Sequence, residues 1–291
     1  MKAGVIYPQT ELGGDPGALK AFAQAAEALN YDHIVIYDHV LGVEHAGREP
    51  QLRGPYTETD PFHEPLITYA YLAGVTQKIE LTTGVLILPQ RQTALVAKQA
   101  ADVDLFSGGR LRLGVGVGWN WVEYDGLEMS SHFKRRGKRQ EAQIALLRKL
   151  WGEPVIDHED SDHRIERAGI LPRPRRQIPI WLGGSSEVAY DRAARIADGF
   201  LFSSRTQTQA VEIKARIEAR LAELDRANDG FGFESIQQFS HGANRWPHDI
   251  ASWRDAGGSH ISVVTMGANL GTVDAHIDAI AQWRKVYDAV G

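Results

Sequence analysis

Cysteine is absent from this chain of 291 residues, which excludes disulfide bonds, thiolate metal ligands and a cysteine nucleophile. There is no apolar run of about twenty residues and no basic leader with a cleavage site, so we expect neither a membrane span nor export. Basic charge is not in excess, because 32 lysines and arginines stand against 37 acidic residues. The net charge of −5 does not favour nucleic-acid binding. We therefore expect a cytoplasmic protein whose partner is a small molecule.

The chain has ample material for a core. Hydrophobic residues make up 43% of it and charged residues 24%, and no linker interrupts it. We expect one domain that covers residues 1–291.

The strongest local pattern lies in residues 108–151. Apolar residues alternate with Gly114, Gly116 and Gly118, which predicts a buried strand that something approaches closely. A polar and aromatic loop follows at residues 119–132, and then a helix that ends at Trp151. Together they form a βα unit.

Two nucleotide-binding motifs are excluded here. A dinucleotide fingerprint needs a third glycine where Trp119 stands. A phosphate loop needs serine or threonine after Gly137-Lys138, and Arg139 stands there instead.

Strands and helices alternate along the chain. Apolar patterns predict strands at residues 3–7, 33–37, 79–88, 111–118, 178–182, 199–202, 231–239 and 260–265. Helical spacing predicts further helices at residues 17–29, 65–76, 93–106, 185–197, 207–227, 247–256 and 273–290. About eight βα units imply a parallel sheet that closes into a (β/α)8 TIM barrel, typically of ~250 residues. The alternative is an open, doubly wound sheet.

Two segments lack a periodic pattern. Residues 41–62, after the second strand, are long and irregular, and we predict that they form a lid. Residues 155–176, before the fifth long strand, form a polar insertion.

In a barrel the active site lies at the carboxyl ends of the strands. These ends read Pro8-Gln9, Asp38-His39, Thr83-Gly84-Val85, Gly118-Trp119-Asn120, Gly183-Gly184-Ser185-Ser186, Ser203-Ser204-Arg205, Ser240-His241 and Met266-Gly267. They carry few charges and much exposed backbone. Such a mouth suits a planar, partly anionic ligand better than a metal ion.

Residues 183–186 open a helix, where free amides and the helix dipole favour a phosphate, although an ordinary helix cap has the same pattern. His39 can donate, accept or shuttle a proton near neutral pH, but a lone histidine after a strand can also be structural. His45, His63 and Glu64 show no recognised ligand spacing, so we predict no metal site.

Aromatic and basic residues offer further candidates. Trp119 and Trp121 could stack on a ring or simply pack in the core. Basic residues at 134–139 are typical of a solvated helix face, but they could also bind the anionic tail of a cofactor. Arg173, Arg175 and Arg176 could serve the same purpose.

Taken together, the sequence resembles the luciferase-like monooxygenase family, and within it the branch that binds the deazaflavin coenzyme F420. The motifs that carry the resemblance are YDHV (37–40), LTTGVLILP (81–89), GGRLRLGVGVGWNWVEYDGLE (108–128), RRGKRQEAQIALLRKLW (135–151) and PIWLGGSSEVAYDRAARIADGF (179–200). They reach from the second strand to the sixth.

The resemblance implies a (β/α)8 barrel and a non-prolyl cis peptide at Gly84-Val85, pressed against the central ring of the coenzyme. It also implies a set of cofactor-binding residues. They are Asp38, His39, Thr83, Gly84, Val85, Val117, Gly118, Trp119, Asn120, Gly183, Gly184, Ser185 and Ser186. His39 would lie near the ring as the catalytic residue, and residues 183–186 would hold the phosphate.

The substrate side departs from the sugar-phosphate dehydrogenases of the branch, which carry a carboxylate at the position of Trp119. We therefore expect a more apolar substrate pocket, with Trp119 and Trp121 as walls and Glu123 in a structural role.

The sequence thus predicts an F420-dependent oxidoreductase that transfers hydride to or from a small organic substrate. One alternative is an FMN-dependent monooxygenase that works with a separate reductase. Another is a non-catalytic carrier of F420 or flavin. Dimers are common in the family, so we expect a homodimer.

Overall fold

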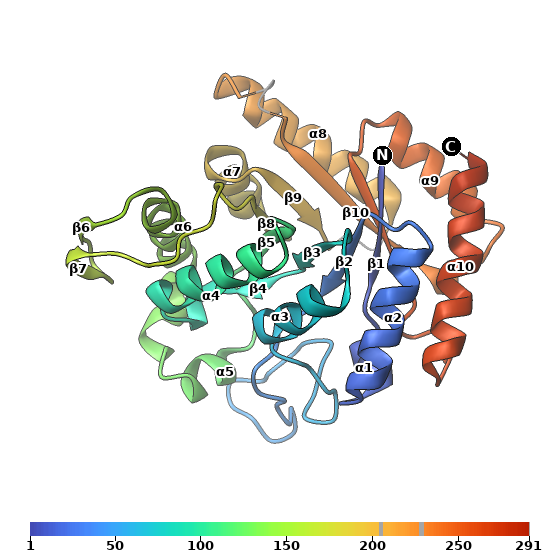
Figure 1. Ribbon diagram of the computed structural model, residues 1–291, viewed down its shortest axis with the longest axis horizontal. Coiled ribbons are helices and arrows are strands. Elements are labelled where there is room, and N and C mark those ends of the chain that lie inside the picture. The colour runs from blue at the N-terminus through green and yellow to red at the C-terminus, as the bar shows by residue number, and fades with distance from the viewer. Residues whose placement is uncertain (204–205, 227–229, 291) are drawn as a thin grey trace.

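The computed structural model describes residues 1–203, 206–226 and 230–290 (Figure 1). Ser204 and Arg205, predicted at a strand end, and Ala227, predicted to end a helix, lie outside these residues.

Parallel strands form a closed barrel, with β3 and β4 as two parts of one interrupted strand. The strands are β1 (Lys2–Ile6), β2 (His33–Ile36), β3 (Glu80–Thr83), β4 (Leu86–Ile87), β5 (Leu111–Gly116), β8 (Ile180–Gly184), β9 (Gly199–Phe202), β10 (Gly232–Gln238) and β11 (His260–Val264). The sheet closes because β1 pairs with β11 and β3 pairs with β5, with Leu81 opposite Leu111. The predicted (β/α)8 barrel is confirmed, and the alternative prediction of an open, doubly wound sheet is wrong.

Helices cover the outside of the barrel (Figure 1). They are α2 (Pro16–Ala28), α3 (Pro65–Val75), α4 (Thr93–Phe106), α6 (Arg136–Gly152), α7 (Glu187–Ile196), α8 (Gln207–Glu223), α9 (Trp246–Asp255) and α10 (Val273–Val290). Several begin at a side-chain cap, such as Asp15 before α2 and Glu64 before α3. Within the described residues, no helix has both the length and the apolar character needed to cross a membrane.

Short elements differ from the sequence prediction. The loop expected at 119–132 contains α5 (Trp121–Gly126) and the 3-10 helix η2 (Ser130–Arg135). The polar insertion contains an antiparallel hairpin of β6 (Ile156–Glu159) and β7 (Arg164–Ala168), at the left edge of Figure 1 beside α6. The remaining elements are α1 (Gln9–Leu12), η1 (Leu88–Gln90) and η3 (Phe239–His241). Residues 41–62 contain neither helix nor strand, as expected of the proposed lid.

A buried ionic network lies inside the barrel, toward the amino ends of the strands. Arg112 on β5 donates to Glu80 at 2.6 Å and to Glu234 on β10 at 2.7 Å, and it lies 4.1 Å from the ring centroid of Trp181. His33 on β2 contacts the other oxygen of Glu234 at 2.7 Å. Burial raises the pKa of Glu234, but the charges of His33 and Arg112 hold it well below its usual range. The network therefore ties four strands together around an ionised carboxylate.

The free energy of unfolding should depend on pH through His260 on β11. Burial, together with the charge of Arg112, lowers the pKa of His260 from 6.5 to about 2. The unfolded chain takes up this proton near pH 6.5, so below that pH the unfolded state binds more protons than the folded state. The free energy of unfolding should therefore decrease as the pH falls, and His260 should contribute up to about 1.4 kcal/mol per pH unit.

His260→Gln should remove this part of the slope between about pH 6.5 and pH 4.5, as measured by urea unfolding. His248→Gln is the control, because the His248 side chain is 83% exposed. An unchanged slope in His260→Gln would show that His260 is not held neutral by the fold.

Candidate active site

A cavity of about 1070 Å³ opens at the carboxyl ends of the strands. It brings together most of the site residues predicted from the sequence. These are Asp38, His39, Gly84, Val85, Val117, Gly118, Trp119, Gly183, Gly184, Ser185 and Ser186. Ile6, Val35 and Ile236 add apolar surface, and Glu234 of the ionic network also lines the cavity. The cavity therefore has apolar walls between polar ends.

Three predicted residues do not line the cavity. Thr83 is fully buried and donates to the carbonyl oxygen of Gly114 at 2.6 Å. Asn120 is buried, and its side chain caps α5 by accepting from the amides of Val122 and Glu123. Trp121 is the first residue of that same helix, which the sequence pattern did not predict. Of the two tryptophans expected to form walls of the substrate pocket, Trp119 lines the cavity and Trp121 does not.

The glycines of β5 make room for residues 83–87, which cross beside them. A Cβ at Gly114 would overlap the carbonyl oxygen of Thr83, and one at Gly116 would overlap a methyl of Val85. At Gly118, where φ is +68°, a Cβ would lie 2.7 Å from Ile87.

The Gly84-Val85 peptide bond in this segment is cis, as the resemblance implied. Asp38 holds the same segment from the other side, because its carboxylate accepts from the amide of Ile87 at 2.8 Å and from Arg91 at 2.7 Å. The backbone therefore carries Val85 to the cavity wall.

Glu123 fixes the orientation of His39. Its Oε2 lies 2.9 Å from Nδ1 of His39, and its Oε1 accepts from the amides of Val40 and Leu41 at 2.8 and 3.2 Å. Burial raises the pKa of Glu123, but the hydrogen bonds from His39 and the two amides outweigh it and lower the pKa below its ordinary value. Because a carboxylate only accepts, Nδ1 of His39 carries a hydrogen, which leaves Nε2 for a ligand.

The sequence offered no signal for this pair. Glu123 is separated from His39 by 84 residues and lies in the unpredicted helix α5. The structural role expected for Glu123 is therefore more specific than the sequence indicated, because Glu123 positions the candidate catalytic residue.

Aromatic rings enclose His39. Tyr56, Phe62 and Trp119 contact its imidazole edge-to-face, with ring centroids 5.4, 4.9 and 5.7 Å away. Tyr56 and Phe62 belong to residues 41–62, and a Cβ at Gly54 of this segment would overlap the indole of Trp119. The segment therefore packs over the mouth as a lid would, and the surroundings of His39 are apolar.

The opposite part of the cavity is cationic. Residues 183–186 lead into α7, where Ser186 is an ordinary helix cap that accepts from the amide of Ala189 at 3.3 Å, while the amides of Glu187 and Val188 have no partner within the helix. Arg192 of α7 and residues 134–136 and 138 line the same cavity. Lys134 and Lys138 are exposed, as expected of a solvated helix face, but they also line the cavity, and Arg139 is 5% exposed. Free amides and basic side chains together suit an anionic group.

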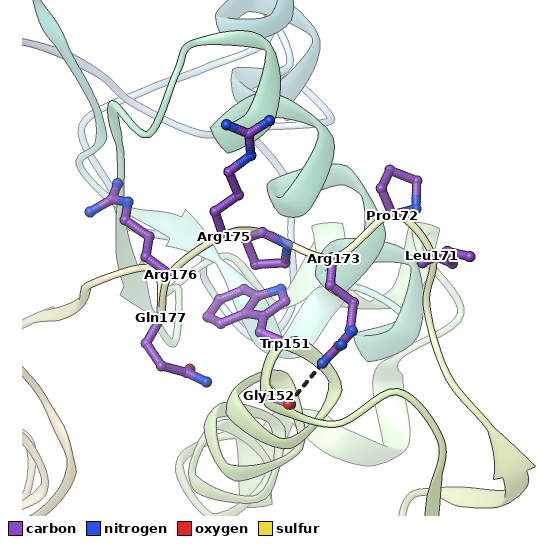
Figure 2. Close-up of a pocket in the computed structure, with 9 residues that line it drawn as sticks. Trp151, Gly152, Leu171, Pro172, Arg173, Arg175, Arg176 and Gln177 are labelled. Atoms are coloured by element: carbon purple, nitrogen blue, oxygen red, sulfur yellow. Dashed lines mark hydrogen bonds between the residues drawn. The ribbon is translucent and has the colours of Figure 1, made fainter.

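The second basic run lies elsewhere. Arg173, Arg175 and Arg176 precede β8, at the opposite end of that strand from residues 183–186, and line a separate depression of about 540 Å³ (Figure 2). Arg173 donates to the carbonyl oxygen of Gly152 at 2.8 Å, and Arg176 to Asp104 at 2.8 Å. These arginines therefore cannot serve the mouth of the barrel.

The fold and the site define a (β/α)8 barrel whose cavity at the strand ends has apolar walls and a cationic rim. The model of the luciferase-like monooxygenase family matches residues 2–245. The chain belongs to this family.

Known proteins resemble the chain at several levels. An uncharacterized protein of Mycobacterium tuberculosis is 30% identical over 74% of this chain and 78% of its own. The F420-dependent glucose-6-phosphate dehydrogenase of Amycolatopsis mediterranei is 29% identical over 65% of this chain and 54% of its own. The pyrimidine monooxygenase RutA of Acinetobacter baylyi is 29% identical over 54% of this chain and 44% of its own. The chain thus spans about half the length of these two enzymes.

A solved structure extends the likeness to the whole fold. It is an F420-dependent secondary alcohol dehydrogenase in complex with an F420-acetone adduct. The TM-score is 0.80 over 98% of both chains, at 13% identity. Relatives and structures of the family thus include both F420-dependent and monooxygenase enzymes, and the chain is a luciferase-like oxidoreductase or monooxygenase.

The close approach of β5 to residues 83–87 should make the stability of the protein sensitive to side chains added at the β5 glycines. Gly114→Ala should lower the free energy of unfolding by roughly 2–3 kcal/mol, because the backbone oxygen of Thr83 cannot move away. Gly116→Ala should cost less, because the Val85 side chain that it meets can shift. Urea unfolding measures both.

Gly74→Ala is the matched control. Gly74 is exposed within α3, and a Cβ there has no atom within 4 Å. This change should stabilise by up to about 1 kcal/mol through helix propensity. A Gly114→Ala protein as stable as the unchanged chain would contradict the close approach.

Proposed function

We propose that this protein is an F420-dependent oxidoreductase that transfers hydride between the deazaflavin and a small, rather apolar organic substrate. The observation that carries the proposal is the arrangement of His39. Its Nδ1 is held by Glu123, and its ring faces an apolar cavity whose other end is cationic.

The residues of the cavity fit the coenzyme. Val85 and Gly118 would lie against the ring, since both line the cavity. The phosphate would rest on Gly183, Gly184, Ser185 and Ser186, at the positive end of the α7 dipole. When bound, the deazaflavin supplies the hydride chemistry, and the protein supplies orientation and a dry site.

Residues around His39 then have distinct tasks. His39 would hold or move the proton that accompanies hydride transfer, at Nε2. Glu123 would keep the ring in the tautomer that leaves this atom available. Tyr56, Phe62 and Trp119 would exclude water from the reacting face.

The basic residues favour F420 over FMN. Both coenzymes have a phosphate, which the amides of residues 183–186 suit. Lys134, Arg136 and Lys138 add more positive charge than one phosphate requires, even though Arg135 is paired with Asp162, and an extended anionic tail would use it. The FMN-dependent monooxygenase remains the second candidate, because relatives such as the pyrimidine monooxygenase support it.

The chain is further proposed to act in the cytoplasm, as a homodimer. Ile67 and Tyr71 are one turn apart on α3 and are 65% and 42% exposed, which supports a protein contact at this helix. We also propose that residues 1–291 form one domain.

Coenzyme titration tests the proposal. F420 should bind at least about tenfold more tightly than FMN, as measured by fluorescence, because of the added charge contacts. Lys134→Gln combined with Lys138→Gln should reduce this preference, whereas Lys285→Gln, on α10, should not. Tighter binding of FMN would favour the monooxygenase, and tight binding without turnover of any substrate would favour the carrier.

Substitutions of the histidine pair test the chemistry. His39→Ala should lower kcat by about 10²–10⁴-fold and leave the Kd of the coenzyme nearly unchanged, because the proton-transfer group is lost. Glu123→Gln should give a smaller decrease in kcat, since the amide can still contact Nδ1 but no longer fixes one tautomer. Steady-state kinetics and coenzyme titration separate the two effects.

Glu44→Gln is the control in this experiment, since Glu44 is an exposed residue of the same lid segment. A His39→Ala enzyme with full turnover would remove His39 from the mechanism.

A further inference from the structure

The turn between β6 and β7 gathers two histidines and an aspartate outside the cavity. Nε2 of His158 lies 2.9 Å from Oδ2 of Asp160, and Nδ1 of His163 lies 3.0 Å from the same oxygen. One ligand atom from each residue lies within 4.8 Å of the other two. The side chains are 20%, 25% and 9% exposed, so the group is partly shielded but open to an ion from solvent.

The backbone of the turn prepares this arrangement. The amide of Asp160 donates to the carbonyl oxygen of His163 at 3.0 Å. Oδ1 of Asp160 accepts from the amides of Asp162 and His163 at 2.7 and 2.8 Å. These bonds fix the carboxylate so that Oδ2 lies near both imidazoles, while Nδ1 of His163 lies 3.0 Å from each of the two carboxylate oxygens.

A second layer of contacts orients His163. Its Nε2 lies 2.7 Å from Oγ1 of Thr93, which is buried at the start of α4. The same oxygen accepts from Gln143 of α6 at 3.1 Å. When Nε2 donates to Thr93, Nδ1 presents its lone pair toward Asp160, which is the arrangement typical of metal-bound histidine. Two lone pairs that face each other then need a cation between them.

We propose that His158, Asp160 and His163 bind a divalent transition-metal ion. Two imidazoles and one carboxylate are suitable ligands for Zn²⁺ and for similar first-row ions. Adjacent ligands on an octahedral ion with bonds of about 2.1 Å are about 3 Å apart, in agreement with the two contacts to Oδ2. Water would complete the coordination.

The ion would stabilise the hairpin. Asp162, inside the same turn, is 2% exposed and forms an ion pair with Arg135, and it lies 3.6 Å from His132. Arg135 lines the large cavity, whereas the three ligands do not. The metal therefore has a structural role, in which it fixes the turn that holds Arg135 in place.

Metal titration of the full chain, without an affinity tag and after treatment with a chelator, tests the site. We expect about one equivalent of Zn²⁺ to bind by calorimetry and to raise the melting temperature. His158→Ala and His163→Ala should each weaken binding by at least about tenfold. Circular dichroism checks that both variants remain folded.

His248→Ala is the matched control, because His248 also lies next to an aspartate, at 3.5 Å from Asp249, but is 83% exposed and outside the cluster. It should bind Zn²⁺ as the unchanged protein does. Absence of a binding isotherm, or equal affinity in the unchanged protein and in His158→Ala, would overturn the proposal. In that case Nδ1 of His163 simply donates to Asp160.

Discussion

The close approach of β5 to residues 83–87 is the constraint on which the mouth of this barrel depends. Gly114, Gly116 and Gly118 recur at every second residue, and they face Thr83, Val85 and Ile87, which recur at the same interval. Side chains at those glycines would push the two segments apart. Because the three glycines have no side chains, Val85 reaches the cavity wall, and the carboxylate of Asp38 can accept from the amide of Ile87.

The barrel interior changes character along its axis. Toward the amino ends, Arg112, Glu234 and His33 form a buried ionic network whose charges are paired across several strands. Above it, Val35 and Ile236 provide an apolar layer, and basic residues line the rim, on η2, α6 and α7. The charged side chains at the base of the barrel are therefore paired with one another, whereas basic side chains at the rim face the cavity. The region between them has low polarity. A flat ring with an anionic end fits this sequence of environments.

Hydrophobic periodicity in the sequence was sufficient to predict the barrel, because its strands are short apolar runs separated by long amphipathic helices. It could not reveal α5, which has six residues, or the hairpin, whose β7 strand is almost entirely exposed and lacks a buried face. The same elements account for what was missed at the site. Glu123, which contacts His39, lies on α5, and the basic run that lines the cavity spans η2 and the start of α6. The residues at the strand ends could be predicted from the sequence, whereas the contacts between separate loops could not.

The two ends of the cavity contribute differently to the choice of chemistry. Near Val85 the walls are backbone and aliphatic groups, which recognise the shape of a ring but not the identity of its central atom. In the proposed function, discrimination between related coenzymes would therefore come from the cationic rim, where Lys134 and Lys138 contribute charge. In the same proposal, discrimination between substrates would come from the lid side, where His39 lies among Tyr56, Phe62 and Trp119. An imidazole enclosed by rings favours a substrate whose polar group lies at the reacting carbon and whose remainder is apolar, because other polar groups would lose their hydration there without gaining a partner.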